Sequence, residues 1–222
     1  MERLENITPK KAREQQKELA QKVVLSGKPE NIKVIAGVDV AYHPRPQTGF
    51  CAVSLFNYPD MTHIKTYTEL DIIGYPYIPG LLGYREGDLI LATLQKVEED
   101  ADVYLFDGNG IAHPRRLGIA SHMGLLIDRP TIGVGKSRLL GEYKEPGSKR
   151  GSISEWRDEG EVIGTVLRTQ DDTHPIFVSP GHKIGIKEAS GIVLQCTTAY
   201  RIPEPIRKAD QEAEKYKNKG DI

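Results

Sequence analysis

The sequence predicts an α/β fold in which a mixed sheet, an antiparallel meander plus parallel strands, is flanked by helices. Three early runs rich in Val, Ile, Tyr and Thr are separated by short turns, which is typical of an antiparallel meander. Later segments with helical periodicity alternate with short apolar runs, which is typical of an α/β layer. The 222 residues suffice for a single domain, residues 1–222, and 38% hydrophobic with 27% charged residues is an ordinary globular composition.

The first half of the chain is expected to contain two helices and three strands. Thr8 at the N-cap and Pro9 after it begin an N-terminal helix, within residues 1–30, whose apolar face continues to Gly27. The other expected elements are strands at Ile32–Tyr42, Phe50–Tyr58 and His63–Ile73, a loop at Tyr75–Gly83, and a helix that begins at Glu86 and ends near Asp100.

The second half is expected to alternate strands and helices. The expected elements are a strand at Asp102–Asp107, a helix at Pro114–Ile127, a strand at Thr131–Val134, a hairpin region up to Glu159, strands at Val162–Arg168 and Ile176–Ser179, a helix at Lys187–Thr198 and a last helix from Pro205. The tail, residues 211–222, is mostly charged. We expect it to be a solvated helix end that frays.

Composition excludes several classes of protein. Two cysteines, Cys51 and Cys196, are too few for a disulfide framework or a four-thiolate zinc site, which favours a reducing compartment. The N-terminus is charged where a signal peptide needs an apolar run, and no apolar stretch approaches the ~20 residues of a membrane span. We therefore expect a cytoplasmic monomer without a membrane partner.

Charge is uneven along the chain although the formal net charge is only −1. Residues 85–107 contain two basic and seven acidic residues, whereas residues 113–150 contain eight basic and three acidic ones. An acidic segment next to a basic one suits a metal site beside a phosphate-binding surface, and it also suits two ordinary solvated faces. Charge alone does not decide between them.

Two glycine-containing segments are compared with nucleotide-binding loops, and neither fits. A Walker A loop needs a glycine five residues before Gly135, where Pro130 stands. The dinucleotide fingerprint that would begin at Gly108 needs its third glycine where His113 stands. The sequence therefore gives no support for ATP or NAD binding by these segments.

Three acidic residues form the strongest chemical pattern. Asp39 interrupts an apolar strand, Asp107 ends another, and Glu86 begins a helix between them. If the two strands pair in parallel, the three carboxylates converge at one end of the sheet. Such a group takes up protons or binds a divalent cation, and oxygen ligands without a Cys/His cluster favour Mg²⁺ or Mn²⁺. Each acid taken singly has an ordinary structural explanation, but the three in this order of elements point to a metal site.

Several segments together closely resemble the endonuclease V family, whose members act beside deaminated adenine. The resemblance runs from about Ile32 to Asp210. The segments that carry it are VIAGVDVAY, PYIPGLLGYREG, LFDGNGIAHPRRLGIASHMG, IGVGKSRLLG, VSPGHKIGI and RIPEPIRKAD. The second and third are the most specific of the six.

The resemblance implies a ribonuclease H-like fold and cleavage of the second phosphodiester bond 3′ to a hypoxanthine (inosine) base, leaving 3′-OH and 5′-phosphate ends. It implies that Asp39, Glu86 and Asp107 hold Mg²⁺, with Mn²⁺ as a substitute, and that Asp210 is an outer member of this site. Lys136 would lie beside the scissile phosphate, and Tyr77 would be the wedge that separates the strands. The resemblance further implies a pocket for the flipped base made by Gly80, Leu82, Gly108, Gly110, His113, Gly118 and Ile119.

The sequence departs from the family at Asn109, where Gln is more familiar. Both side chains are amides, so the hydrogen-bonding groups persist with one methylene less reach. His113 has an alternative interpretation as a cap of the helix predicted from Pro114. Arg115, Arg116 and Arg138 are expected to position phosphates or form structural ion pairs and not to read bases.

Inosine-containing DNA is the expected partner, and inosine-containing RNA is the second candidate, because both present hypoxanthine and a phosphate. Two other functions stay open from the residues. One is a ribonuclease H-like nuclease of different specificity, such as a junction resolvase. The other is a non-catalytic protein that binds inosine-containing nucleic acid.

Overall fold

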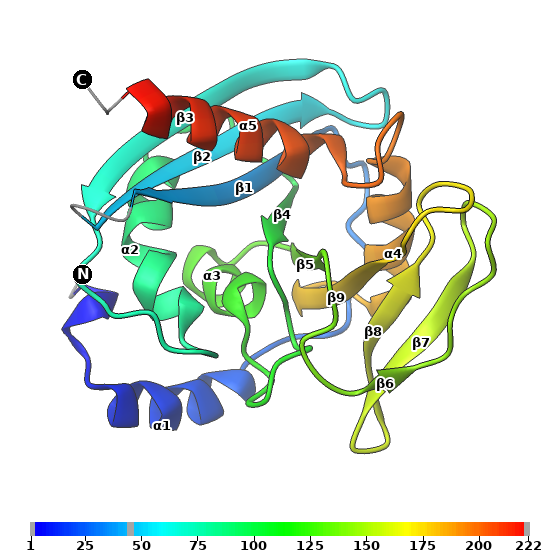
Figure 1. The fold of residues 1–222 in the computed structure, drawn as a ribbon, viewed down its shortest axis with the longest axis horizontal. Coiled ribbons are helices and arrows are strands. Elements are labelled where there is room, and N and C mark those ends of the chain that lie inside the picture. Colours follow the sequence, from blue (N-terminus) through cyan, green and yellow to red (C-terminus); the bar gives the residue numbers. More distant parts are fainter. Residues whose placement is uncertain (1–2, 44–46, 220–222) are drawn as a thin grey trace.

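The computed structural model describes residues 3–43 and 47–219. The described strands form one sheet in the order β3-β2-β1-β4-β5-β9-β8-β7-β6 (Figure 1). They are β1 (Val34–His43), β2 (Thr48–Asn57), β3 (His63–Ile72), β4 (Val103–Asp107), β5 (Thr131–Gly135), β6 (Glu142–Tyr143), β7 (Ile153–Asp158), β8 (Glu161–Leu167) and β9 (Ile176–His182).

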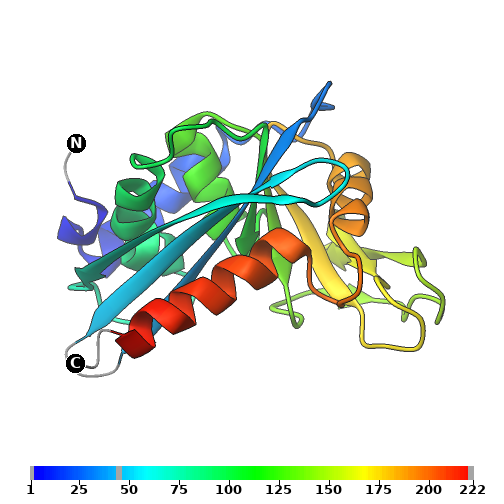
Figure 2. The ribbon, with the colours of Figure 1, turned by 90° about the horizontal axis from the view of Figure 1, so that it is seen from above.

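Helices cover both faces of this sheet. The described helices are the 3-10 helix η1 (Leu4–Asn6) and the α-helices α1 (Pro9–Ala20), α2 (Leu82–Leu94), α3 (Ile119–Ile127), α4 (Ile186–Gln195) and α5 (Glu204–Lys219). Figure 2 shows α5 along one side of the sheet and α2 and α3 on the other. Within residues 3–43 and 47–219, no helix has both the length and the apolar character that a membrane crossing needs.

The sheet is mixed, as the sequence predicts. β1, β2 and β3 form an antiparallel meander, whereas β4 lies parallel to β1 and β5 lies parallel to β4. The parallel register pairs Val38 with Phe106. The residues that follow, Asp39 and Asp107, therefore lie at the same level on neighbouring strands, at the carboxyl end of β4. The predicted α/β class with a mixed sheet is confirmed.

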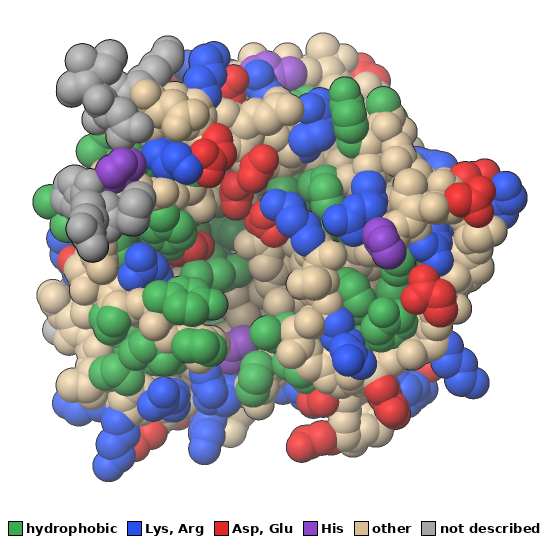
Figure 3. Space-filling view, in the orientation of Figure 1, with side chains coloured by type: hydrophobic (Ala, Val, Ile, Leu, Met, Phe, Trp, Pro, Cys, Tyr) green, Lys and Arg blue, Asp and Glu red, His purple; other side chains and the backbone are tan. Residues whose placement is uncertain are grey.

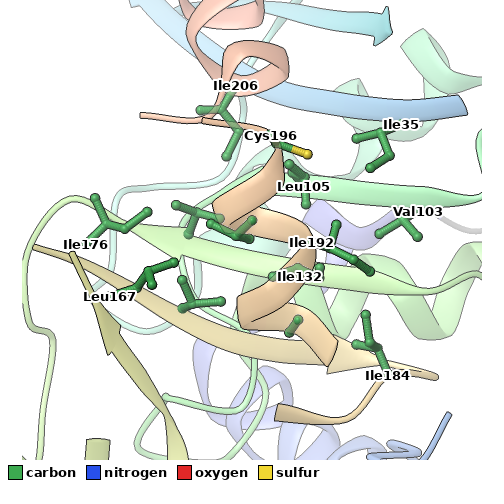
Figure 4. Packing of buried hydrophobic residues seen from close by; sticks show 14 of the residues in the cluster. Ile35, Val103, Leu105, Ile132, Leu167, Ile176, Ile184, Ile192, Cys196 and Ile206 are labelled. Atoms are coloured by element: carbon green, nitrogen blue, oxygen red, sulfur yellow. The ribbon is translucent and has the colours of Figure 1, made fainter. Parts of the chain in front are cut away.

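Side chains of β1 alternate between two hydrophobic cores on opposite faces of the sheet. Ile35 packs in the core that contains residues of α4 and the first turn of α5 (Figure 4). Val38 and Val40 pack on the other face, in the core that contains residues of α2 and α3. Asp39, between the two valines, therefore belongs to the α5 face of the sheet.

The first helix is shorter than the sequence predicts. α1 ends at Ala20, whereas the apolar pattern suggests a helix as far as Gly27. The segment after α1 is held by tertiary hydrogen bonds instead: Val24 N donates to His182 Nδ1 at 3.2 Å, and Gly185 N donates to the Gly27 carbonyl at 3.1 Å. Docking against the end of β9 thus overrides the local helical pattern.

The prediction of a helix from Pro114 is wrong, because α3 begins only at Ile119. Arg116 has a φ of 54°, in the left-handed region that an α-helix excludes, and its N–H donates to the His113 carbonyl at 2.8 Å. Gly118 N donates to the Gly110 carbonyl at 2.9 Å. Residues 110–118 therefore form a compact loop, and His113 cannot be the cap of a helix that starts at Pro114.

Two further helices have shifted ends. α2 begins at Leu82 and ends at Leu94, so Glu86 lies in the second turn of the helix and does not begin it. α4 covers Ile186–Gln195, against the predicted Lys187–Thr198. The ends of α2 shift by several residues and those of α4 by one and three, because apolar periodicity locates a helix better than its caps.

The predicted fraying of the C-terminal helix is wrong as far as the helix is described. α5 continues through Lys219. Ala213 is fully buried, and the ring of Tyr216 packs edge-on against Phe50 with 5.7 Å between ring centroids. The charged residues occupy the outer face of a docked helix. Residues 220–222 of the predicted tail lie outside the described residues.

Candidate functional site

Asp39 and Asp107 lie beside each other where β1 and β4 run parallel. Burial, together with the negative charges of Asp107 and Asp210, raises the pKa of Asp39 to about 7, against the opposing charge of Lys136. The strand register brings the carboxylates of Asp39 and Asp107 together, as the sequence analysis expects. These groups are therefore near enough to repel one another.

Glu86 approaches the same region from α2 and is buried. Burial raises its pKa to about 8, and the charges of Asp39 and Asp107 act in the same direction. We call Asp39, Glu86, Asp107 and Asp210 the acidic cluster. Its members come from two strands and two helices, and their charges contribute to the raised pKa values of Asp39 and Glu86.

Tyr42 holds Glu86, and the sequence analysis assigned no role to it. The Tyr42 hydroxyl donates to Glu86 Oε1. The guanidinium carbon of Arg85 lies 4.8 Å from the centroid of the Tyr42 ring, which fixes the ring from the other side. Strand alternation could have identified Tyr42, because it shares the α2 face of β1 with Val38 and Val40.

α5 brings Asp210 to the acidic cluster because the start of the helix packs closely on β1. A Cβ atom on Gly37 would lie 2.1 Å from the carbonyl carbon of Pro205, so glycine is needed for this contact. One turn later, Ala209 packs against Ala41 of β1. Small residues on both elements let the helix lie close to the strand, and Asp210 follows Ala209 directly.

Lys136, just after the end of β5, links two members of the acidic cluster. Its Nζ lies 2.6 Å from Asp107 Oδ2 and 3.8 Å from Asp210 Oδ1. The nearby carboxylates raise the pKa of Lys136, against the effect of its partial burial, so it is a cation at neutral pH. Figure 3 shows acidic side chains next to basic ones beside a hollow near the centre of this face.

The donor set of the acidic cluster suits a hard divalent cation. All its ligand atoms are oxygens, and four carboxylates face one lysine, which leaves an excess of negative charge. As the side chains lie, no three His, Cys, Asp or Glu side chains within residues 3–43 and 47–219 are arranged to hold one ion. Rotation of the carboxylates, and movement of Lys136 away from Asp107, would be needed to bring them onto one ion.

A pocket of about 160 Å³ adjoins the acidic cluster. Six of the seven residues expected to surround a flipped base line it: Gly80, Leu82, Gly108, His113, Gly118 and Ile119. The seventh, Gly110, lies against β9 instead. A Cβ atom there would be only 2.0 Å from the carbonyl oxygen of Pro180. The other lining residues are Gln16, Tyr77, Ile78, Gly83, Asn109, Leu117 and Leu139.

Two exposed apolar side chains are part of this lining. Tyr77, expected to be a wedge, is 72% exposed, and Leu139, which the sequence analysis did not single out, is 53% exposed. They belong to segments on either side of α2 and α3 in the chain, which local sequence patterns cannot relate. Exposed large apolar side chains around a pocket are typical of a binding site.

His113 is a neutral histidine with a defined tautomer. Burial, and then the charge of Arg115, lowers its pKa to about 4. Its Nδ1 accepts a hydrogen bond from Arg115 N at 3.2 Å, so the hydrogen is on Nε2, which donates to the Gly80 carbonyl at 3.1 Å. The pocket therefore presents an uncharged imidazole.

The three arginines singled out in the sequence have different surroundings. Arg116 pairs with Asp158 at 2.9 Å and with Glu161 at 2.8 Å, as a structural ion-pair residue would. Arg138 is exposed, and its Nη1 donates to the Gly141 carbonyl at 3.0 Å. Arg115 is turned toward the pocket, where its Nη2 donates to the Gly80 carbonyl at 2.8 Å.

Comparison with known proteins gives consistent matches along the chain. The family model described as Endonuclease V matches residues 17–211. An Endonuclease V of Methanothrix thermoacetophila is 48% identical over 205 residues, which are 92% of this chain and 90% of the relative. An Endonuclease V of Dehalococcoides mccartyi is 44% identical over 204 residues, 92% of each chain.

Solved structures match equally well. The crystal structure of an Endonuclease V from Streptomyces avermitilis has a TM-score of 0.93 at 35% identity and covers 97% of this chain and 95% of its own. An Endonuclease V from Ciona intestinalis, solved in complex with a 24mer DNA containing an inosine followed by a ribo-adenosine, has a TM-score of 0.84 at 30% identity and covers 95% of this chain and 98% of its own.

Proposed function

This chain belongs to the endonuclease V family, and we propose that it is a magnesium-dependent endonuclease that recognises a flipped hypoxanthine base and cleaves the second phosphodiester bond 3′ to it. The products would be 3′-OH and 5′-phosphate ends. The observation that carries the proposal is the continuity of the two parts of the site. Asp107 belongs to the acidic cluster, and the next residue, Gly108, lines the pocket. A base in the pocket thus brings its own backbone phosphates close to the acids.

In this proposal Asp39, Glu86 and Asp107 hold Mg²⁺, or Mn²⁺ in its place, and Asp210 acts from outside them. When bound, the ion supplies positive charge to the phosphate and lowers the pKa of a water. Tyr42 keeps Glu86 in place through its hydrogen bond. The carboxylates themselves are already gathered by the sheet register and by α5.

Lys136 would act on the phosphate. It is a compact point charge on a flexible stem, and its ion pair with Asp107 keeps it at the carboxyl end of the parallel strands. From there the ammonium would be released to a phosphate oxygen, where it offsets the negative charge that develops during cleavage.

The pocket would receive the base. About 160 Å³ is well below the roughly 300–1,000 Å³ of sites for drug-sized ligands, so it suits a single nucleobase. Its polar lining includes the neutral His113 and the Asn109 amide, and its apolar lining includes Leu117 and Ile119. Such a lining suits the stacking and edge contacts by which flipped bases are held.

Tyr77 would fill the space that the flipped base leaves. It is exposed at the pocket, and Pro76 and Pro79 restrict the backbone around it. A stiff loop loses little conformational entropy when its tip inserts between bases, and inosine pairs are weak enough to open easily.

Inosine-containing DNA is the proposed partner, supported by the Ciona relative that was solved with such a strand. Inosine-containing RNA is the second candidate. Parallel rate measurements on one sequence with inosine in DNA and in RNA decide between them. Action as a monomer in the cytoplasm belongs to the same proposal, and size-exclusion chromatography and cell fractionation test it.

The experiment that tests the proposed function is nicking of an end-labelled oligonucleotide that carries one inosine, beside the same strand with adenine. Incubations contain Mg²⁺, Mn²⁺ or EDTA. We expect one product, cut at the second bond 3′ to inosine, only with a metal ion. Tight binding of the inosine strand without cleavage would instead indicate a non-catalytic binder. Equal cleavage of the inosine and adenine strands would indicate a nuclease of different specificity.

A further inference from the structure

The loop that carries Tyr77 ends in a turn that is fixed from three sides. Leu81 N donates to the Ile78 carbonyl at 2.9 Å, which closes a turn over Pro79 and Gly80. Gly80 has a φ of 80°, and proline followed by a residue with positive φ defines a type II turn. Tyr77 directly precedes this turn, so the turn sets the direction in which the tyrosine leaves the protein.

The carbonyl oxygen of Gly80 accepts hydrogen bonds from three different side chains. Gln16 Nε2 donates at 2.9 Å, Arg115 Nη2 at 2.8 Å and His113 Nε2 at 3.1 Å. A carbonyl has two lone pairs, so this oxygen is fully used. A Cβ atom on Gly80 would also lie 2.7 Å from Arg115 Nη2, which shows how closely the arginine approaches the turn.

Gln16 connects this turn to the 110–118 loop, which also lines the pocket. Its side chain is 2% exposed, and its Nε2 also donates to the Leu117 carbonyl at 3.2 Å. Its Oε1 accepts from Arg115 Nε at 2.6 Å. The Gln16 amide therefore binds the turn, the 110–118 loop and Arg115, which also binds the turn. Gln16 itself lines the pocket.

We propose that Gln16 is a positioning residue for recognition: it locks the Tyr77 loop to the base pocket, so that insertion of the tyrosine and capture of the base occur in one fixed geometry. This inference rests on the proposed function. It makes α1 part of the recognition apparatus, although Gln16 lies before Ile32, where the resemblance of motifs begins.

Docking of α1 does not depend on Gln16 alone. Ala12 is fully buried in a cluster with Tyr75 and Leu81, and the Tyr84 hydroxyl donates to the Ala12 carbonyl at 3.1 Å. The Tyr84 hydroxyl also lies 3.0 Å from Gln15 Oε1. A change at position 16 can therefore loosen the turn while the helix stays in place.

Two substitutions separate these roles. Gln16→Glu keeps the size and the oxygen that accepts from Arg115, but a carboxylate cannot donate to the Gly80 and Leu117 carbonyls. Gln16→Met keeps the length and removes all polar contacts. Gln21→Met, at the exposed end of the same helix, is the matched control. Melting curves set a working temperature at which all four proteins are folded.

The first measurement needs no substrate: amide hydrogen exchange at Leu81, whose N–H closes the turn. We expect exchange about 5- to 10-fold faster in both Gln16 variants and unchanged in Gln21→Met, since the loss of hydrogen bonds lowers the cost of local opening. Unchanged exchange at Leu81 in Gln16→Glu would overturn the proposal.

The second measurement is kcat/KM for inosine in duplex and in single-stranded DNA. We expect both Gln16 variants to lose about tenfold on duplex and less than about threefold on single strands, because only the duplex must be propped open. An equal loss on the two substrates would show a merely structural role and overturn the proposal. If the unmodified protein cleaves neither substrate, the proposed function fails, and exchange at Leu81 still decides whether Gln16 holds the turn.

Discussion

The acidic cluster and the base pocket adjoin each other, yet they are built on opposite electrostatic principles. The acids are buried beside like charges: burial first, and then the neighbouring carboxylates, raises the pKa of Asp39 to about 7 and that of Glu86 to about 8. In the pocket, by contrast, the Gly80 carbonyl accepts from three donors and His113 is neutral. The first region has unfavourable charge repulsion that a cation would relieve, whereas the second is preorganised without any ligand.

The largest expected effect is at the acidic cluster. Asp107→Asn keeps the shape of the side chain and removes a negative charge, so nicking should fall by about a thousandfold or more. Binding of the inosine strand in Ca²⁺ should persist, and the melting temperature without metal should change little, because relief of the repulsion from Asp39 opposes loss of the ion pair with Lys136. Single-turnover nicking, a binding assay and thermal melts measure these three quantities.

Asp172→Asn is the matched control for that variant, since Asp172 is exposed, remote from the acidic cluster in the β8–β9 connection, and has a φ of 54° that Asn tolerates. Near-normal cleavage by Asp107→Asn in Mg²⁺ would sink the assignment of Asp107 as a metal ligand.

Asp210→Ala should have a smaller effect, about 10- to 100-fold on nicking, because an outer residue tunes the metal without defining its site. High Mn²⁺ or Mg²⁺ should restore part of the activity. The rate as a function of metal concentration measures both, with Glu214→Ala on the same helix as the control. A loss as complete as that of Asp107→Asn would make Asp210 a direct ligand, and no loss would make it an ordinary surface residue.

Tyr42→Phe tests whether the acids need support from the surrounding protein. Removal of the hydroxyl leaves Glu86 without its hydrogen bond, and we expect about a tenfold loss with a higher Mg²⁺ requirement. Tyr58→Phe is the control, because the Tyr58 hydroxyl likewise donates to a side-chain oxygen, on Gln195, but far from the site. An unchanged metal requirement in Tyr42→Phe would remove Tyr42 from the mechanism.

Tyr77→Ala tests the pocket side of the comparison. It should reduce cleavage of duplex DNA by several-fold to about tenfold and affect single strands less, since a single strand has no stack to open. The metal requirement should stay the same, and Tyr200→Ala changes another exposed tyrosine as a control. If both substrates lose the same factor, or the protein melts at a much lower temperature, Tyr77 is structural.

The last expected effect is on stability, not on activity, and it concerns pH. Since burial lowers the pKa of His113 to about 4 in the folded protein, against about 6.5 when unfolded, the unfolded state binds more protons between these values. Through His113 alone, the free energy of unfolding therefore decreases by at most about 3 kcal/mol as pH falls from about 6.5 to about 4. Asp39 and Glu86, whose pKa values are raised, change the free energy of unfolding in the opposite direction. The quantity to measure is therefore the difference in the free energy of unfolding between wild type and His113→Gln.

Denaturant unfolding in EDTA across this pH range gives that difference, with the exposed His174→Gln as the control. We expect His113→Gln to lose less stability than wild type on acidification. Parallel pH curves for the two proteins would show that His113 titrates normally and is not held neutral by the fold.

Sequence reasoning worked best for the region whose geometry follows from strand pairing. Asp39 and Asp107 each follow a residue of one register pair, so their proximity could be predicted once the strands were assumed parallel. Gln16 could not be found in this way, because its partner Gly80 is 64 residues distant and the contact depends on how α1 docks. Leu139 was missed for the same reason.

The helix predicted from Pro114 is wrong for a reason that the local sequence does not show. A proline after a polar residue is a good helix start, but Arg116 adopts a left-handed conformation in a loop closed by backbone hydrogen bonds, and its guanidinium pairs with Asp158 and Glu161. Those partners lie more than forty residues further along the chain. The loop therefore forms in a tertiary environment that local propensity does not describe.

The close contact between Gly37 and Pro205 has a consequence for the synthesis of this protein. Asp210 is added about a hundred residues after Asp107, which is about 5 to 20 seconds of translation. Until α5 has left the ribosome and packed against Gly37, a growing chain carries Asp39, Glu86 and Asp107 but lacks Asp210 at the acidic cluster. The order of translation therefore makes the acidic cluster one of the last parts of this protein to be completed, because its fourth carboxylate lies on the C-terminal helix.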